Sequence, residues 1–369
     1  ALELGGAQGA DWESHGEPRD GVLKIGTRAC LVVHEQFRWI YVKQPKPSCV
    51  GSHGLNRSTV WEGWQGLRAI SRRSEGYRHD REAVIFHLVQ DLKHEVLAPG
   101  VALMALGTPT LPPATTTNTL IVGHRRLAVI EPASPYADEQ RHLEEYVHGA
   151  RERGAEVAAL LVTHHHRDHV GHVARLREEL GAPVMAHKET AARVSFRVDQ
   201  MLGDGDVVEL DAGHRIRARH TPGHAPGHLV FIEEKSEVIH VGDMLAGVGT
   251  ILIEPGDGGN MGEYLDSLRL IRDSLCTPNT RLVPAHGPVI ERPQSACDAL
   301  IEHRLRRESK VLRGVETQAR SFDELLALVY EDTPQKLWPL AALSLEAHLQ
   351  KLIEDGRITR AGAQISSTS

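Results

Sequence analysis

The sequence is poor in cysteine and in aromatic residues, and it contains no long apolar segment. Its four cysteines, Cys30, Cys49, Cys276 and Cys297, form no C-x-x-C pair, which argues against a structural zinc site and favours free thiols in a reducing compartment. Aromatic residues make up 4% of the chain, so we expect a core of valine, leucine, isoleucine and alanine. No apolar run approaches the roughly 20 residues that cross a bilayer. Because the polar, acidic N-terminus is also unlike a signal peptide, we expect a cytoplasmic protein.

A strong excess of basic charge is also missing. The formal net charge is −7 at pH 7, so the composition indicates neither a nucleic-acid partner nor a membrane. The length of 369 residues exceeds one compact unit, and a hydrophobic content of 41% is sufficient for a buried core. We expect three parts, namely an N-terminal extension over residues 1–100, a strand-rich domain over residues 101–293 and a helical module over residues 294–369.

The middle of the chain alternates short apolar runs with helical patterns. The run from Val157 to Thr163 is apolar almost throughout, as expected of a strand that is buried on both faces. A helix with one apolar stripe follows it, and Gly181 marks the end of that helix. This alternation predicts an α/β domain.

The two ends of the chain have different patterns. Residues 1–20 predict no regular structure, and the runs at 29–33 and 39–42 predict a hairpin. Near the C-terminus, Ser321 and Glu324 form a capping box that predicts the start of a helix. A second helix ending at Gly356, with a short strand after it, completes a pattern that indicates a winged-helix module.

The most informative stretch follows the apolar run at 157–163. It has the form H-x-H-x-D-H and contains His164, His166, Asp168 and His169. Imidazoles and a carboxylate at this spacing can hold two divalent metal ions side by side. The alternative is a solvated loop that is merely rich in histidine.

Three later strands end in further candidate ligands, His224, Asp243 and His286, each beside a glycine. Side chains on turns next to rigid strands can be held to the small tolerances that metal sites require. Each residue alone is more often an ordinary core, surface or turn residue. As an ordered set after the histidine stretch, they indicate a metal centre.

The motifs T-H-x-H-x-D-H-x-G, T-P-G-H-x-x-G-H, G-D and A-H-G-P succeed one another in an order that resembles the metallo-beta-lactamase superfamily. A closer resemblance, over roughly residues 100–360, is to beta-lactamase-like protein 2 and its bacterial relatives. It is carried by Gly249-Thr250, by the residues after His286 and by Leu349 to Ile358. The resemblance implies a four-layer αββα sandwich as the catalytic domain, with a C-terminal winged-helix-like module.

The resemblance also implies two divalent cations, zinc or alternatively manganese or iron, held by seven side chains. Three imidazoles would hold the first ion, those of His164, His166 and His224. The second ion would be held by Asp168, His169 and His286, and the carboxylate of Asp243 would bridge the two ions. A hydroxide between the ions would attack the substrate. Asp168 would orient it or move its proton, and His228 would contact the substrate or support the ligands.

Two departures from the family pattern affect this interpretation. Gly171 is followed by His172, where relatives have a second glycine, and Thr116 stands where relatives have a histidine. Some bacterial relatives carry a Nudix domain ahead of the segment at 108–114. Residues 1–100 contain no Nudix box, so we expect a structural extension there.

The substrate class stays open at this point. The close resemblance implies an endoribonuclease acting on single-stranded RNA, yet residues 296–320 have a net charge of only about +2. A thioesterase like glyoxalase II is the alternative, and lactam hydrolysis has no specific support. A scaffold without catalysis is disfavoured because none of the seven ligands is missing. A homodimer is also expected from the resemblance.

Overall fold

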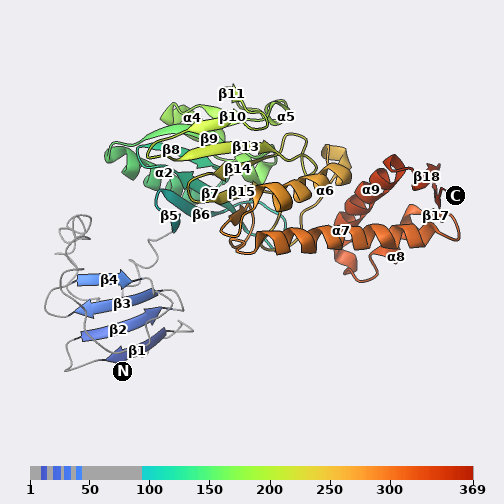
Figure 1. Ribbon diagram of the computed structural model, residues 1–369, viewed down its shortest axis with the longest axis horizontal. Coiled ribbons are helices and arrows are strands. Elements are labelled where there is room, and N and C mark those ends of the chain that lie inside the picture. Colours follow the sequence, from blue (N-terminus) through green and yellow to red (C-terminus); the bar gives the residue numbers. More distant parts are fainter. Residues whose placement is uncertain (1–9, 15–19, 26–28, 35–38, 44–93, 369) are drawn as a thin grey trace. The chain divides into compact units, whose positions relative to one another are not determined.

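The computed structural model describes residues 10–14, 20–25, 29–34, 39–43 and 94–368 (Figure 1). The chain divides into two compact units, Ala1–Glu82 and Ala83–Ser369. No helix in the described ranges is both long enough and apolar enough to cross a membrane.

The first unit contains a four-stranded antiparallel sheet. Its strands are β1 (Ala10–Ser14), β2 (Asp20–Ile25), β3 (Ala29–His34) and β4 (Trp39–Lys43), in that order across the sheet. The pairing of β3 with β4 confirms the predicted hairpin. The prediction of no regular structure over residues 1–20 is wrong for β1, which β2 stabilises through backbone pairing; the rest of that segment, apart from Asp20 in β2, lies outside the described residues.

The larger sheet of the second unit has seven strands in the order β11–β10–β9–β8–β7–β6–β5. Strands β5 to β8 pair antiparallel, and β9, β10 and β11 extend the sheet in parallel from β8. The strands are β5 (Glu95–Ala98), β6 (Val101–Gly107), β7 (Thr116–Val122), β8 (Arg126–Ile130), β9 (Glu156–Leu161), β10 (Val184–Ala186) and β11 (Gln200–Met201).

The second sheet has five strands in the order β12–β13–β14–β15–β16, and only β15 and β16 are parallel neighbours. Its strands are β12 (Val207–Glu209), β13 (Arg215–His220), β14 (Leu229–Glu233), β15 (Val238–Gly242) and β16 (Arg281–Pro284). Leu120 and Leu161 of the larger sheet share one buried cluster with Ile216 and Phe231 of this sheet, so the two sheets face each other.

Helices cover both outer faces of the sheet pair (Figure 1). On the seven-stranded sheet, Leu143 of α2 and Leu176 of α4 pack among residues of β6 to β9. On the five-stranded sheet, Leu265 of α6 and Ile301 of α7 (Pro293–Val315) pack on β14 to β16. This arrangement confirms the predicted αββα sandwich. The helices are α2 (Ala137–Glu152), α3 (Arg167–Val170), α4 (Val173–Leu180), α5 (Lys188–Ala191), η4 (Pro255–Asp257), α6 (Met261–Leu270) and η5 (Ile271–Leu275).

The C-terminal module is built on the second half of α7 (Pro293–Val315). It also contains β17 (Arg320–Ser321), α8 (Phe322–Val329), η6 (Gln335–Leu337), α9 (Trp338–Glu354), β18 (Ile358–Ala361) and β19 (Gln364–Ser367). Ser321 and Glu324 form the predicted capping box, and β17, β19 and β18 form a small sheet. The predicted winged-helix arrangement is therefore confirmed. The boundaries proposed at residues 100 and 293 stay predictions, and β5 already joins the larger sheet before residue 100.

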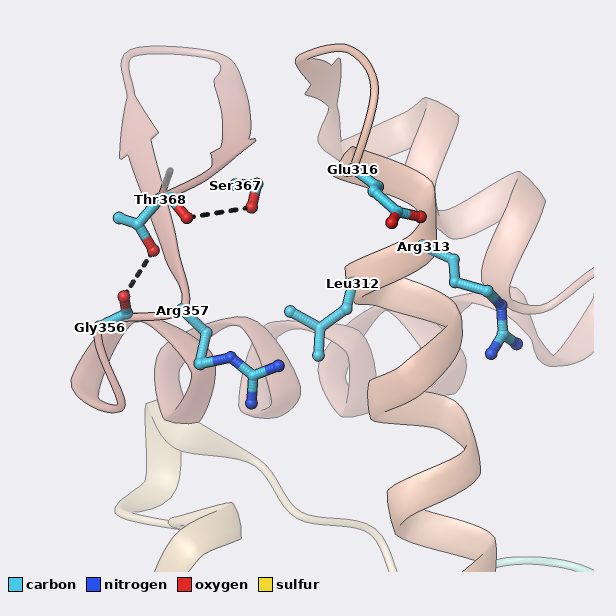
Figure 2. Close-up of a pocket in the computed structure, with 7 residues that line it drawn as sticks. All are labelled: Leu312, Arg313, Glu316, Gly356, Arg357, Ser367 and Thr368. Atoms are coloured by element: carbon cyan, nitrogen blue, oxygen red, sulfur yellow. Dashed lines mark hydrogen bonds between the residues drawn. The ribbon is translucent and has the colours of Figure 1, made fainter.

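A pocket of about 460 Å³ lies in the C-terminal module between the end of α7 and the residues after α9. Figure 2 shows Leu312 of α7 and Arg357 extending toward each other across it. Arg313 and Thr368 also line the pocket. The residues that line it include none of the predicted metal ligands, so it is a separate feature of the module.

Candidate metal centre

The seven predicted ligands all follow strand ends on one edge of the sandwich. The histidine stretch follows β9, His224 follows β13, Asp243 follows β15 and His286 follows β16. Strands β15 and β16 are parallel neighbours, and β13 runs in the same direction as β15, so the carboxyl ends of all three open onto one edge. The structure brings all seven side chains into two adjoining clusters.

The first cluster contains three imidazoles whose ring nitrogens converge. His164 Nε2 lies 3.0 Å from His166 Nδ1 and 3.2 Å from His224 Nε2, and the last two atoms are 3.0 Å apart. Three ring nitrogens at mutual hydrogen-bond distance cannot all be satisfied by protons, because each carries either one N–H or one lone pair. Three lone pairs directed at a common cation would satisfy the arrangement.

The opposite nitrogen of each ring has its own polar partner, which fixes the ring orientation. His224 Nδ1 donates to the carbonyl oxygen of Leu252 at 2.8 Å. His166 Nε2 lies 2.8 Å from Asp257 Oδ2, and His164 Nδ1 lies 2.9 Å from the hydroxyl of Thr163. These outer contacts are the kind that select the ligand tautomer of a metal-bound histidine.

Burial keeps two imidazoles of the first cluster, those of His164 and His224, neutral. Burial lowers the pKa of His164 well below its usual value and lowers the pKa of His224 to about 4. Neighbouring imidazoles add to the shift of His164. Both side chains are therefore uncharged near pH 7, which is the form that binds metal.

The second cluster contains Asp168, His169 and His286. Asp168 Oδ2 lies 3.5 Å from His286 Nε2, and Asp168 Oδ1 lies 3.7 Å from His169 Nε2. His286 Nδ1 donates to the carbonyl oxygen of Thr116 at 2.9 Å, which leaves its Nε2 lone pair facing the cluster. Because Thr116 contributes its backbone oxygen, this contact does not require the histidine that relatives have at that position.

Asp243 lies between the two clusters. Its Oδ2 is 3.5 Å from His224 Nε2 and 3.6 Å from His169 Nε2, and its Oδ1 is 3.4 Å from His286 Nε2. Within the described part of the chain, Asp243 Oδ1 and His169 Nε2 are buried and have no hydrogen-bond partner. Buried polar atoms rarely stay unsatisfied, so these two atoms fit a site in which Asp243 and His169 would both bind a cation.

Glu131 is a buried contributor that the sequence motifs did not reveal. Its carboxylate accepts the backbone N–H of Thr163 at 2.6 Å and also bonds to Nδ1 of His169. Its φ of 58° lies in the left-handed region, which a residue other than glycine rarely adopts. Burial opposes a charged His169, but Glu131 and Asp243 nevertheless raise the pKa of this imidazole well above its usual value, so the site favours positive charge.

Asp257 is a second contributor without a sequence signal. It lies in the short helix η4, about 90 positions from the histidine stretch, and is half-exposed. Its Oδ2 accepts from His166 Nε2 at 2.8 Å and from His165 Nε2 at 3.1 Å. It therefore orients the imidazole of His166 from the solvent side.

His228 supports the cluster from behind. It is completely buried, its Nε2 accepts the backbone N–H of Asp243 at 3.1 Å, and its Nδ1 bonds to Thr221 Oγ1 at 2.9 Å. It is not among the residues that line the cavity at the metal ligands. Of the two roles predicted for His228, this geometry favours support of the metal ligands over contact with the substrate. A side chain at Gly242 would come within 2.5 Å of His228 Nε2, so this turn requires glycine.

The unusual Gly171-His172 pair is accommodated structurally. A Cβ at Gly171 would lie 2.6 Å from the carbonyl oxygen of Ala133, so only glycine fits this position. His172 is buried, and its Nε2 lies 3.0 Å from Glu144 of α2. The extra imidazole therefore joins α2 to the start of α4 and does not reach the metal ligands.

A cavity of about 910 Å³ opens onto the clusters. It reaches His166, Asp168, His224, Asp243 and His286. Its walls come from residues 109–114 and 245–254, from α7 and from the C-terminal module, and they include Leu111, Leu245, Ile251, Leu300 and Leu340. A large space with mostly apolar walls and a few convergent polar groups is the usual form of a small-molecule site.

The chain is similar to known proteins over this region. Residues 111–286 match the metallo-beta-lactamase superfamily, and residues 321–366 match the beta-lactamase-associated winged-helix domain. A beta-lactamase-like protein 2 homolog of Drosophila melanogaster is 28% identical over 260 residues, which are 66% of this chain and 84% of that protein. An atrochrysone carboxyl ACP thioesterase of Passalora fulva is 30% identical over 257 residues, 66% of this chain and 72% of that protein.

The fold is also found in solved structures. A beta-lactamase domain protein from Burkholderia ambifaria superimposes with a TM-score of 0.64 at 19% identity, over 74% of this chain and 93% of that one. A metallo-beta-lactamase family protein from Thermus thermophilus gives a TM-score of 0.60 at 24% identity, over 74% of this chain and 100% of that one. With strand-end ligands in two adjoining clusters, the chain belongs to the metallo-beta-lactamase superfamily and is a hydrolase of that fold.

Proposed function

We propose that this hydrolase cleaves an acyl thioester whose acyl group is largely apolar. The observation that carries the proposal is the cavity, since the same space that reaches five predicted ligands is walled by aliphatic side chains. An apolar acyl group would bury its surface there, at about 25 cal/mol per Å² removed from water. The similarity to fungal atrochrysone carboxyl ACP thioesterases supports the same substrate class.

The ligand set supports a pair of divalent ions, which we infer to be zinc, with manganese or iron as alternatives because histidine and carboxylate ligands accept all three. When bound, the ions would supply a water activated at neutral pH and a Lewis acid for the scissile carbonyl. The protein itself supplies orientation and proton transfer. The Asp168 carboxylate lines the cavity, where it accepts the proton of the attacking water and passes it to the departing thiolate.

Cleavage of single-stranded RNA is the second candidate, and the cavity offers it little support. Three arginines line the cavity. Arg304 is buried, Arg307 is paired with Asp332 at 2.7 Å, and Arg167 is the one that is exposed. The mouth also carries acidic side chains, including Asp257. A phosphate backbone needs several accessible cations along its path, and the described cavity does not provide such a row.

The test is a parallel assay of metal-loaded protein on acyl thioesters of increasing chain length and on single-stranded RNA. We expect thioester hydrolysis that improves with acyl length and falls by about 10²- to 10⁴-fold in Asp168→Asn. A matched control is Asp266→Asn, an exposed residue on α6 that pairs with Arg269. RNA cleavage that is lost in Asp168→Asn but kept in Asp266→Asn, without thioester hydrolysis, would replace the proposal by the nuclease function.

A further inference from the structure

We propose that Arg304 binds an anionic oxygen group of the substrate, a carboxylate or a phosphate, inside the cavity that reaches the metal ligands. The proposal rests on the proposed function only for the reaction that comes after binding. It assigns a recognition role to a side chain of α7 that is not one of the predicted metal ligands.

Arg304 is a buried cation without an anionic partner in the described part of the chain. Its side chain lines the cavity although the residue is only 3% exposed. One guanidinium nitrogen, Nη2, donates to the carbonyl oxygen of Ile251, and Nε is buried with no hydrogen-bond partner among the described residues. No carboxylate of the described residues lies within ion-pair distance of this guanidinium.

The neighbouring groups do not supply the missing negative charge. Glu308, one turn further along α7, is paired with Lys351 at 3.1 Å. The ring of Tyr264 lies 5.4 Å from the Arg304 guanidinium carbon, and burial raises the pKa of this phenol to about 12, so it stays neutral. Tyr264 also hydrogen-bonds to Arg304, so these neighbours of the guanidinium are either neutral or already paired.

Arg307 provides the contrast, because it lines the same cavity from the same helix. Its Nη1 donates to Asp332 Oδ1 at 2.7 Å and to the carbonyl oxygen of Val329 at 2.6 Å, and its guanidinium carbon lies 4.7 Å from the centre of the Tyr330 ring. Arg307 thus joins α7 to α8, whereas Arg304 lines the cavity and keeps unused donor capacity.

A buried unpaired charge destabilises a folded protein, and it is retained where a ligand completes it. An anionic oxygen group is the natural partner, because the planar guanidinium matches carboxylate and phosphate geometry. In a thioester such a group can come from the acyl chain, as a terminal carboxylate, or from the thiol carrier, as the phosphate of a phosphopantetheine arm. Leu300 and Leu340 line the same cavity, so the acyl or pantetheine chain beside the anion would be covered.

The kinetic test uses four thioesters with the metal-loaded full chain. N-acetylcysteamine, which lacks phosphate, and coenzyme A each carry either a neutral apolar acyl chain or one of equal length that ends in a carboxylate. For Arg304→Gln we expect kcat/KM to fall about 10- to 100-fold, through KM, on substrates with the relevant anion. On the neutral N-acetylcysteamine thioester the change should stay within about twofold. A fall in kcat/KM on the two thioesters with a terminal carboxylate places the anion on the acyl chain. A fall on the two coenzyme A thioesters places it on the thiol carrier.

Two controls separate binding from a structural effect. Arg304→Lys keeps the charge and should recover part of the loss, whereas Arg307→Gln should lower the thermal midpoint and weaken all four substrates alike. Equal loss on all four thioesters in Arg304→Gln, or no loss on any, overturns the proposal.

A binding measurement keeps the inference independent of the reaction. Hexanoate is compared with hexanamide, and pantetheine 4′-phosphate with pantetheine, by thermal shift on metal-loaded wild type and Arg304→Gln. Any anion binding by the metal ions is common to both proteins and cancels. We expect at least one anionic probe to stabilise the wild type more than its neutral counterpart, and the difference to vanish in Arg304→Gln. If the difference persists, Arg304 is not the anion site, even when thioesters are cleaved.

Discussion

The carboxylate of Glu131 holds Nδ1 of His169, and both side chains are completely buried. Because the same carboxylate also accepts the backbone N–H of Thr163, it joins the end of β9 to the second ligand cluster. Its left-handed backbone conformation is strained for a glutamate. The fold therefore stores strain at the position that orients a metal ligand.

Replacing Glu131 by Gln should weaken the second metal ion selectively. The amide still fills the space, but it removes the charge that stabilises the Nδ1–H of His169. We expect about a 10- to 100-fold loss of affinity for one of two ions, measured by competition with a chelator. The first ion should bind as in the wild type. Equal weakening of both ions, or of neither, would contradict the assignment.

Asp257→Asn should weaken the first ion, since Asp257 orients His166 through a 2.8 Å contact. Asp257 is half-exposed and solvent replaces part of the lost contact, so we expect an effect nearer to about tenfold than to 100-fold. Glu254→Gln is the matched control, because Glu254 lines the same cavity but does not hydrogen-bond to His166. A metal affinity that falls as much in the control as in Asp257→Asn would show that the charge of the cavity mouth is responsible.

His228→Ala tests whether this residue supports the site or contacts the substrate. The substitution leaves the backbone N–H of Asp243 buried without its acceptor and also opens space, at a cost of about 2–5 kcal/mol. We expect a large fall in the free energy of unfolding and weaker binding of both ions. His228→Gln, which can still accept the N–H, should recover part of both. Full stability and metal content with lost turnover would instead place His228 at the substrate.

His348 gives a prediction about acid stability that does not involve metal. Burial lowers the pKa of this completely buried imidazole to about 3, whereas an exposed histidine titrates near 6.5. Below pH 6.5 the imidazole of His348 binds a proton in the unfolded chain but not in the folded chain, so the free energy of unfolding falls as the pH drops toward 3. The slope for this group is about 1.4 kcal/mol per pH unit.

His348→Leu removes this proton uptake and two buried ring nitrogens that have no partner among the described residues. We expect it to raise the free energy of unfolding by about 1–2 kcal/mol at pH 7 and to flatten the acid side of the profile. Denaturant unfolding between pH 4 and 8 measures both effects. A parallel profile for variant and wild type would show that His348 is protonated or hydrated in the folded protein.

The α/β class and the candidate ligands could be predicted from local signals, whereas the sandwich and the division of the ligands between two ions came from the family resemblance. The strand before the histidine stretch is buried in its second half and reads as one apolar run, and the other candidate ligands follow the ends of later strands. The same rule would have identified Glu131, which directly follows β8, but its backbone conformation has no sequence signal. Asp257 could not be found because nothing in the sequence around this ordinary acidic residue of η4 indicates a contact with a histidine 91 positions away.

The cavity was not predictable for a related reason. Its walls combine residues 109–114 with side chains near residue 340, and only tertiary packing brings them together. The expected homodimer, the domain boundaries and the roles assigned to individual ligands stay predictions, as does the structural role of residues 1–100.

Helix α7 is one continuous element of 23 residues that belongs to two cores. Cys297 and Ile301 pack under the five-stranded sheet, whereas Val311 and Val315 pack inside the C-terminal module. The cavity wall lies between these two cores, so an evolutionary change in that wall also changes the packing of both cores. Chains that keep the metal ligands but differ in this helix and in the C-terminal module would accept different substrates, so selectivity could diversify while the hydrolytic chemistry is left untouched.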